Sequence, residues 1–299
     1  MRLRLSYDAP MHDSTRLAFF ALALLTTGCI GGDSASSSSA HAIDVNGMQR
    51  EYRLFTPAAP PAGEMPLLIA VHGGSGREDR FPQQTEFEAL AEEQGLVIAY
   101  PLSELQPGNE GEWLLNTAPE SRHDLDFMEA LIDDISARHS IDATRIYGTG
   151  YSLGSMFTYE LACHLSNRFA AVASHAGAMP ASPNSCAPEH NIGVMHLHGV
   201  QDPIIPYSSG WSWKEWDQVG SMLSTPELIQ FWAQQNACQE SSETAGSSSS
   251  HLIHSGCGQN VRVEHHRLET VGHEWPDEIE GQATYQLLWS FLQDFQRLP

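Results

Sequence analysis

Lysine is almost absent from this sequence. Among 299 residues Lys214 is the only lysine, and 15 lysines and arginines stand against 37 acidic residues, for a formal net charge of −22. A chain this acidic offers no basic face to a phosphate backbone, so nucleic acid is excluded as an expected partner. Nothing in the sequence indicates an obligate protein partner. The 41% of hydrophobic residues is ample for a sizeable core.

A hydrophobic run long enough to span a bilayer is also missing from the N-terminal region. Residues 17–25 are apolar, but this run is too short to cross a membrane and has the length of a signal-peptide core. The segment before it is long for a signal peptide and contains Asp8 and Asp13. Translation from Met11 instead of Met1 would leave a more compact basic region.

The apolar run ends in Thr26-Thr27-Gly28-Cys29, which resembles a bacterial lipobox, whose cysteine is lipidated. We therefore expect residues 1–29 to be a lipoprotein-type signal peptide and the Ser-rich residues 30–42 to be a flexible tether. The only expected membrane contact is a lipid anchor on Cys29, and Ile30 favours the outer membrane. The alternative is simple cleavage and secretion. Both predict an exported protein of the bacterial cell envelope or exterior.

Export changes how the remaining four cysteines are interpreted. An even number of cysteines in an oxidising compartment predicts two disulfides, and four cysteines allow three pairings. Proximity in the sequence favours Cys163 with Cys186 and Cys238 with Cys257. Each bond would close a loop worth about 3 kcal/mol in the chain-entropy model.

A metal site is not expected. The sequence has no Cys-x-x-Cys pair of the kind that binds zinc. His196 and His198 lie on one predicted strand, and we expect them to point to opposite faces of the sheet and so not to share an ion. No cofactor is expected.

Strands and helices alternate from residue 43 to the end of the chain. Strands are expected at residues 43–49, 50–56, 66–71, 96–101, 145–149, 170–176, 192–197 and 261–271, with a turn at Asn46-Gly47. Helices are expected from Phe87 to a Gly95 cap, after a capping Asp124, and at 155–162, 226–236 and 283–295. This alternation predicts one α/β domain, residues 43–299, with helices on both faces of a doubly wound, mostly parallel sheet.

Residues 150–154 read Gly-Tyr-Ser-Leu-Gly and fit the Gly-x-Ser-x-Gly pattern of a nucleophile elbow. In such a turn, a Cβ two residues before or after the serine would clash, which explains Gly150 and Gly154. An ordinary Gly/Ser turn is the alternative, but a strand-like segment precedes the motif and a helix-like run follows it. Ser152 is thus the expected nucleophile, and no lysine stands three residues later to form a Ser-x-x-Lys pair.

A serine nucleophile needs a base, and the base needs a carboxylate that fixes its tautomer. In hydrolases with this elbow the order along the chain is serine, acid, histidine, each after the end of a strand. Asp202 follows the strand predicted at 192–197, and His273 follows the one predicted at 261–271. These two residues are the expected acid and base.

The chain has fifteen histidines, so the choice of His273 depends on its position. His265 and His266 lie within the predicted strand, where one would face the core and the other solvent or a helix. His251 and His254 flank a Ser-rich loop. Only His273 follows the strand and has a glycine before it.

The developing negative charge on the substrate needs backbone N–H donors. One should come from Leu153, the residue after the nucleophile. The second should come from the His72-Gly73-Gly74-Ser75 loop, with Gly74 or Ser75 as the donor.

These motifs resemble the secreted polyhydroxybutyrate depolymerase and feruloyl esterase family of α/β-hydrolases over residues 43 to 297. The matching stretches are His72-Gly73-Gly74, Arg145-Ile146-Tyr147 with the elbow, Phe169-Ala170-Ala171-Val172-Ala173, His198-Gly199 with Asp202, Phe231-Trp232 with Cys238, and Gly272-His273-Glu274-Trp275-Pro276. The resemblance implies an α/β-hydrolase fold and a triad of Ser152, Asp202 and His273.

The resemblance predicts an exported serine esterase that acts on polyhydroxybutyrate-oligomer, feruloyl or acetyl esters through an acyl-enzyme. Trp113, Trp211 and Trp275 are candidates for gripping such a small or oligomeric substrate, although a lid packed on itself would also explain aromatic rings in loops. The chain ends after its last helix without an extra binding module, which we expect to disfavour crystalline polymer and to favour a soluble or oligomeric ester. The alternatives are a serine peptidase on the same fold and a non-catalytic binding lipoprotein.

Overall fold

The computed structural model describes residues 37–74, 80–104, 113–184, 186–208, 210–212 and 219–297. The predicted signal peptide, Cys29, Ser75 and Lys214 lie outside these residues, and the predictions for them stay predictions. Among the described residues, no helix combines the length and the hydrophobicity that a membrane crossing requires.

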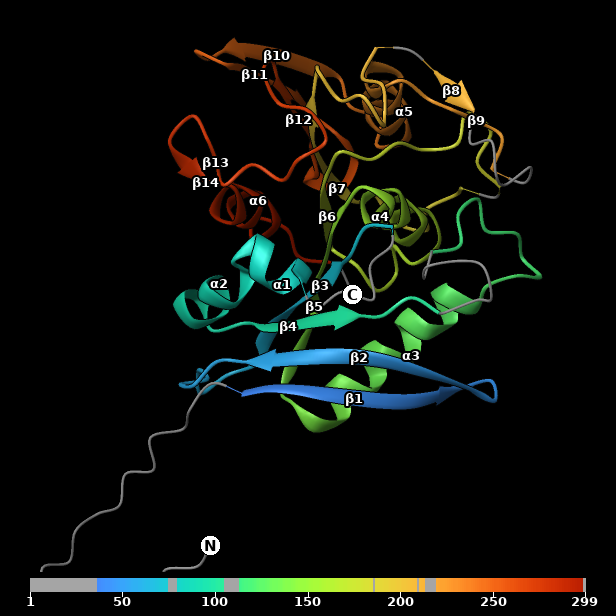
Figure 1. The fold of residues 1–299 in the computed structure, drawn as a ribbon, viewed down its shortest axis with the longest axis vertical. Coiled ribbons are helices and arrows are strands. Elements are labelled where there is room, and N and C mark those ends of the chain that lie inside the picture. Colours follow the sequence, from blue (N-terminus) through green and yellow to red (C-terminus); the bar gives the residue numbers. More distant parts are fainter. Residues whose placement is uncertain are drawn as a thin grey trace, which may run out of the picture. The chain divides into compact units, whose positions relative to one another are not determined.

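A ten-stranded sheet forms the centre of the fold (Figure 1), in the order β1-β2-β4-β3-β5-β6-β7-β12-β11-β10. Its strands are β1 (Ser37–Val45), β2 (Met48–Thr56), β3 (Met65–Val71), β4 (Val97–Pro101), β5 (Ile141–Tyr151), β6 (Ala171–His175), β7 (Gly193–Gly199), β10 (Glu240–Ala245), β11 (Ser249–Ser255) and β12 (Val263–Leu268). The six central strands, β4 to β12 in this order, pair in parallel, and antiparallel hairpins extend both edges. The predicted mostly parallel sheet is confirmed.

Helices cover both faces of this sheet, as predicted (Figure 1). They are α1 (Arg80–Thr85), α2 (Phe87–Gln94), α3 (His123–Arg138), α4 (Leu153–His164), α5 (Thr225–Gln235) and α6 (Thr284–Leu292). Because side chains alternate along a strand, Leu67 and Ile69 of β3 join a core with α3, α4 and α5, whereas Leu68 and Ala70 join a second core with α2 and α6. Such two-sided burial explains the continuous apolar runs of the central strands.

The hairpin at the N-terminal edge turns at Asn46-Gly47, as predicted, with φ of 56° and 84° at these two residues. Its first strand starts earlier than expected. Residues 37–42, assigned to the flexible tether, pair with β2 through the register Ser37 to Thr56. The predicted boundary at residue 43 is therefore wrong, because backbone pairing with β2 orders a serine-rich sequence that has little strand preference of its own.

The predicted N-cap of α3 is also wrong. The helix starts at His123 with Arg122 in the cap position, and Asp124 lies inside its first turn. The Asp124 carboxylate is buried and pairs with the buried guanidinium of Arg50 at 2.7 Å, while it also accepts the N–H of Leu114 at 2.7 Å. The carboxylate thus joins the N-terminal hairpin to α3 and to the loop after β4, because a buried charge needs such partners.

Strands β10 and β11 were not predicted. Every residue of β10 is exposed, and the serine-rich sequence around residues 247–250 gives no apolar alternation. The segment is ordered by pairing: β10 lies against β11 and β11 against β12. The two short pairs β8 (Trp211–Ser212) with β9 (Ser221–Met222), and β13 (Glu278–Ile279) with β14 (Gln282–Ala283), were missed as well.

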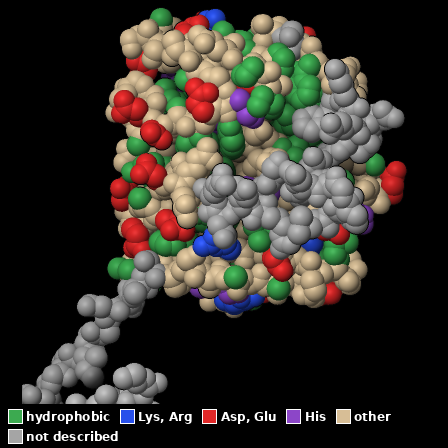
Figure 2. All heavy atoms as spheres, viewed as in Figure 1, with side chains coloured by type: hydrophobic (Ala, Val, Ile, Leu, Met, Phe, Trp, Pro, Cys, Tyr) green, Lys and Arg blue, Asp and Glu red, His purple; other side chains and the backbone are tan. Residues whose placement is uncertain are grey.

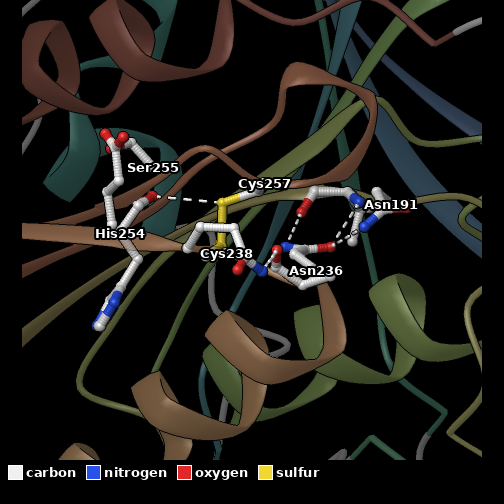
Figure 3. Close-up of a disulfide and its surroundings, with 10 residues drawn as sticks. Asn191, Asn236, Cys238, His254, Ser255 and Cys257 are labelled. Atoms are coloured by element: carbon white, nitrogen blue, oxygen red, sulfur yellow. Dashed lines mark hydrogen bonds between the residues drawn. A yellow bond between two sulfur atoms is a disulfide. The ribbon is translucent and has the colours of Figure 1, made fainter.

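Both predicted disulfides are confirmed: Cys163 bonds to Cys186, and Cys238 to Cys257. Figure 3 shows the second bond beside Asn236, at the end of α5. The Asn236 side chain accepts the N–H of Ile192 at 3.2 Å and donates to its carbonyl at 2.8 Å. This corner therefore fixes the start of β7 relative to α5 and the β11–β12 edge.

Candidate active site

Ser152 stands at the junction of β5 and α4, where the elbow motif predicts it. Its backbone has φ 56° and ψ −122°, a conformation that costs a non-glycine residue free energy and that persists only where the surroundings impose it. The Ser152 N–H donates to the carbonyl of His175 at 3.0 Å, which ties the turn to the end of β6.

The two elbow glycines are required by close backbone contacts. A Cβ on Gly150 would lie 2.3 Å from the carbonyl oxygen of Gly154, and a Cβ on Gly154 would lie 2.1 Å from that of Val71. Real Cβ atoms do not approach carbonyl oxygens so closely, and the obstacle in both cases is backbone, which cannot swing aside. The predicted reason for both glycines is confirmed.

Ser152, His273 and Asp202 lie in hydrogen-bond contact although the sequence separates them widely. Ser152 Oγ lies 2.9 Å from His273 Nε2, and His273 Nδ1 lies 2.7 Å from Asp202 Oδ2. The Asp202 side chain is fully buried, whereas that of His273 is 13% exposed. The three residues follow the carboxyl ends of β5, β7 and β12, and these strand ends bring them together at one edge of the sheet.

Asp202 is oriented by its own loop. Its Oδ1 accepts the N–H groups of Ile204 and Ile205, each at 2.8 Å, and its Oδ2 accepts from His273. Burial alone would raise the pKa of Asp202, but the hydrogen bonds from His273, Ile205 and Ile204 together hold that pKa below its ordinary value. Asp202 is therefore ionised at neutral pH and keeps a proton on His273 Nδ1.

The loop that carries His273 is held by β5, β6 and β7. The Tyr151 hydroxyl donates to the His273 carbonyl, and His175 Nε2 lies 2.8 Å from the Glu274 carbonyl. Gly199 allows the loop to approach, since a Cβ there would lie 2.2 Å from the carbonyl oxygen of Val271. Tyr151 and His175 were not predicted as site residues; Tyr151 is one of the variable positions in the elbow pattern.

His198 and His196 form a buried chain behind Asp202. His196 Nε2 lies 2.9 Å from His198 Nδ1, so both rings are on the same face of β7. The prediction of opposite faces is wrong because positions two apart on a strand share a face. Burial lowers the pKa of both rings, so each is neutral.

The direction of the hydrogen bonds in this chain is set by its ends. His198 Nε2 must donate to the Ile205 carbonyl at 2.9 Å, so His198 Nδ1 accepts from His196 Nε2. His196 Nδ1 then accepts from the Tyr159 hydroxyl at 2.7 Å. Ser174 donates to Tyr159 at 3.1 Å. His198 Nε2 also lies 3.5 Å from Asp202 Oδ2, so the chain ends at the Asp202 carboxylate.

His265 and His266 point to opposite faces of β12, but neither faces solvent. Their residues are 4% and 6% exposed. His265 contacts the carbonyl of His196 at 2.8 Å and the hydroxyl of Tyr207 at 2.9 Å. His266 stacks on His251, which lies on β11 rather than in a loop. Of the two alternatives expected for the second ring, exposure to solvent is wrong, and His266 instead lines a cavity together with Leu287 of α6.

The residues predicted for the oxyanion hole lie beside Ser152 where they are described. Leu153 begins α4 directly after Ser152. A Cβ on Gly73 would lie 3.2 Å from Ser152 Cβ, and one on Gly74 would lie 3.9 Å from Leu153 Cδ2. The loop after β3 therefore passes next to the elbow. Ser75 lies outside the described residues.

His72 anchors this loop. Its Nε2 accepts the N–H of Ser103 at 3.2 Å, so its Nδ1 donates to the Gly73 carbonyl at 2.7 Å. Burial lowers the pKa of His72 to about 4, which keeps the ring neutral as these bonds require. Trp113 Nε1 donates to the His72 carbonyl at 2.9 Å.

Trp113 and Trp275, which the sequence suggested as contacts for a substrate, are instead buried. Trp113 is fully buried and stacks on Phe157 at 5.0 Å between ring centroids. Trp275 is 7% exposed and packs edge-on against Tyr151 and His175. Trp113 thus supports the loop after β3, and Trp275 packs against the residues that hold the His273 loop. Trp211 is partly buried against the core, and its contact with substrate stays a prediction.

A hydrophobic side chain that the sequence did not single out stands next to Asp202. Ile204 is 62% exposed and is the one large apolar side chain among the described residues that is so open to solvent. Its N–H holds Asp202, so its position relative to the site is fixed. Ile204 stands in a Pro-Ile-Ile-Pro stretch that has no helix or strand periodicity, and this pattern does not indicate which of the two isoleucines is exposed.

A solved acetyl xylan esterase from Aspergillus awamori has the same architecture, with a TM-score of 0.59 and 15% identity over 85% of this chain and 99% of that one. The central sheet, the elbow and this likeness define the class of the protein, which has the α/β-hydrolase fold.

The model of the family described as esterase PHB depolymerase matches residues 50–246, and the chain belongs to this family. The chain is 26% identical over 258 residues to the putative esterase NocK of Nocardia uniformis subsp. tsuyamanensis, with 81% of this chain and 75% of that protein covered. It is 22% identical over 233 residues to feruloyl esterase B of Piromyces equi, with 77% of this chain but only 42% of that protein covered. The protein is thus a carboxylic ester hydrolase.

Proposed function

We propose that this protein is an exported serine esterase with Ser152 as nucleophile, His273 as general base and acid, and Asp202 as the carboxylate that orients His273. The observation that carries this proposal is the pair of contacts of 2.9 Å from Ser152 Oγ to His273 Nε2 and 2.7 Å from His273 Nδ1 to Asp202 Oδ2. A serine hydroxyl is a poor nucleophile unless such a base takes its proton.

In the acylation step, Ser152 Oγ attacks the ester carbonyl while His273 Nε2 accepts its proton. The ionised Asp202 stabilises the resulting imidazolium through Nδ1–H. The oxyanion is stabilised by the N–H of Leu153 and by one from Gly74 or Ser75. The proton on Nε2 then passes to the departing alkoxide, which leaves as an alcohol and gives the acyl-Ser152 ester.

In the deacylation step, water takes the place of the alcohol. His273 Nε2 accepts a proton from the water as its oxygen attacks the acyl carbonyl, and the same oxyanion donors stabilise the charge. The proton then returns to Ser152 Oγ as the carboxylic acid leaves. The Tyr159-His196-His198 chain supports both steps by holding the Ile205 carbonyl and Asp202 in place.

The substrate class we propose is a soluble hydroxybutyrate oligomer, a feruloyl ester or an acetyl ester. The family description and the names of the two esterase relatives support this range. The exposed Ile204 beside Asp202 supplies an apolar surface for part of such a substrate. We propose Trp211 as a second contact.

We also propose that residues 1–29 direct export and that residues from 37 onward form the catalytic domain. The two disulfides support an oxidising location. Labelling with a palmitate analogue in a bacterial host tests the anchor: label on the wild type and none on Cys29→Ala is expected. Absence of label on a wild type that appears in the medium would instead favour simple secretion.

A fluorophosphonate probe tests the proposed nucleophile. We expect the probe to label the wild type and not to label Ser152→Ala. Ser290→Ala, which removes an exposed serine of α6, should be labelled like the wild type. Equal labelling of Ser152→Ala would reject the proposal. A panel of p-nitrophenyl acyl esters, methyl ferulate and hydroxybutyrate oligomers then ranks the substrates by kcat/KM.

A further inference from the structure

One face of the β11–β12 strand pair carries three side chains of the kinds that bind transition metals. His251 of β11 and His266 of β12 are direct partners in the antiparallel register. Glu264 lies two residues before His266, so its side chain is on the same face. None of the three belongs to the Ser152 site, and no part of the proposed mechanism uses them.

The three side chains are already close together. One potential ligand atom from each lies within 4.8 Å of the other two. His251 Nε2 is 2.8 Å from Glu264 Oε2, and the rings of His251 and His266 stack with their centroids 4.0 Å apart and their planes 17° apart. Ligands of a tetrahedral zinc ion at about 2.1 Å are themselves roughly 3.4 Å apart, so only small shifts separate this cluster from a coordinating one.

The second observation is an unsatisfied nitrogen. His266 is 6% exposed, and its Nε2 is buried without a hydrogen-bond partner among the described residues. Buried polar atoms in native proteins nearly always have a partner, and an isolated exception is commonly explained by a bound water or ion. The Nε2 atom of His266 therefore has no hydrogen bond to lose when it binds an ion.

An access route leads to the two histidines. His251 and His266 line a cavity of about 300 Å³ whose other walls include Ser249 and Glu280. The His251 side chain is 31% exposed, so its ring can move. Acidic side chains gather over α2 and the β13–β14 hairpin (Figure 2), and the cavity wall itself contains the exposed Glu280. This charge attracts cations to the entrance.

We propose that His251, Glu264 and His266 form a binding site for a divalent transition-metal cation of the zinc class. Two imidazoles and one carboxylate are a ligand set that such ions accept, with a fourth position left for water. The lone pairs of stacked rings are nearly parallel, so the His251 ring tilts out of the stack to share an ion with His266. The cation then bridges β11 and β12, the strand that leads to the His273 loop.

The charge around Glu264 is compatible with this site. Arg262 contacts Glu264 through Oε1, whereas His251 contacts Oε2, so the two oxygens have separate roles. Arg262 also pairs with Asp294 at 2.8 Å, which offsets its positive charge. The Oε2 atom therefore remains available as the third ligand.

Zinc titration of tag-free, EDTA-treated and dialysed protein tests the proposal. By calorimetry we expect one zinc ion per chain to bind to the wild type and the affinity to fall at least tenfold in His251→Ala and in Glu264→Gln. His254→Ala is the matched control, because it removes a half-buried histidine from the opposite face of the same strand. It should bind zinc like the wild type.

Cobalt provides an independent measurement that does not depend on ester hydrolysis. The visible absorption of Co²⁺ bound by the wild type should report two nitrogen ligands and be lost in His251→Ala. Thermal unfolding in EDTA shows that each variant is folded before titration. Zinc binding that is equal in the wild type, His251→Ala and Glu264→Gln, or no zinc binding by the wild type, would overturn the proposal, whereas the Ser152 mechanism would be unaffected by either result.

Discussion

At the scale of single residues, the strongest constraints around Ser152 are those on glycine. The positive φ of Ser152 brings the start of α4 against the end of β3, and Gly154 has no room for a side chain there. The loop with Gly74 lies close to Leu153, since a Cβ on Gly74 would be 3.9 Å from Leu153 Cδ2. Backbone packing, more than any side-chain contact, sets the geometry of the elbow.

Gly154→Ala is predicted to disrupt the elbow. The new Cβ would lie 2.1 Å from the Val71 carbonyl oxygen, so β3 or α4 must shift. We expect the free energy of unfolding to fall by about 3 kcal/mol and kcat/KM to fall by about 100-fold. Urea denaturation and ester kinetics check this. Gly63→Ala, where nothing lies within 4 Å of the added Cβ, should change neither; a fully active Gly154→Ala enzyme would contradict the account.

His198 is predicted to act as a positioning residue for Asp202. In His198→Gln the chain from Tyr159 no longer ends at the Ile205 carbonyl, and the Asp202 loop loses a fixed contact. We expect kcat to fall about 10- to 100-fold while KM changes little, because substrate binding does not involve His198.

His265→Gln is the matched control for His198→Gln. It removes an equally buried ring from the same face of the neighbouring strand, one whose hydrogen bonds go to the His196 carbonyl and the Tyr207 hydroxyl rather than to Ile205 or Asp202. Steady-state kinetics and thermal unfolding of both variants separate the two roles. A loss of stability in both with unchanged kcat in His198→Gln would show that the chain is only structural.

At the scale of elements, the sequence predicts those helices, buried strands and loops that follow from apolar periodicity and strand order. The sequence predicts the apolar runs of β3 and β4, the helical spacing of α3 and the two loops that carry Asp202 and His273. These features depend on local chain preferences and on the fold class. β10 and β11 were not predicted, because exposed polar strands owe their structure to pairing with β12.

Other contacts depend on tertiary partners that no local pattern reveals. In the sequence Asp124 resembles a helix N-cap, but in the structure its carboxylate forms a buried ion pair with Arg50. Trp113 looks like a loop aromatic for substrate, but it fills the core beside Phe157. The shared face of His196 and His198, in contrast, follows from strand geometry alone, because side chains two positions apart on a strand point the same way.

The Cys238–Cys257 bond is predicted to contribute to stability and not to the chemistry. It joins the end of α5 to the segment after β11, with a sequence separation of 19 residues. Replacing both cysteines with serine should lower the free energy of unfolding by about 3 kcal/mol and leave kcat nearly unchanged. Urea denaturation of the double variant against the wild type, with and without reductant, checks this. No change in stability would contradict it.

At the scale of the whole molecule, the buried histidines predict sensitivity to acid. Burial lowers the pKa of His72, His175 and His266 to about 4 each and that of His265 to about 3. The unfolded chain protonates these rings below its pKa of about 6.5, whereas the native state does not until pH 4 or below. The stability that they contribute is present above pH 6.5 and is lost as the pH falls toward 4.

The predicted result is a free energy of unfolding that falls steeply between pH 6.5 and 4, by about 1.4 kcal/mol per pH unit for each such histidine. Urea denaturation at several pH values measures this slope. His175→Asn, if folded, should reduce it. A stability that is flat across this range would contradict the assignment of these rings as buried and neutral.

The most direct test of the account is to find the acyl-enzyme. The wild type is mixed with p-nitrophenyl acetate, quenched in acid within the first turnovers and digested with trypsin. We predict that mass spectrometry finds one acetyl group on Ser152, in the peptide between Arg145 and Arg168, and none in Ser152→Ala. An acetyl group on another residue, or hydrolysis by Ser152→Ala at the wild-type rate, would contradict the central claim.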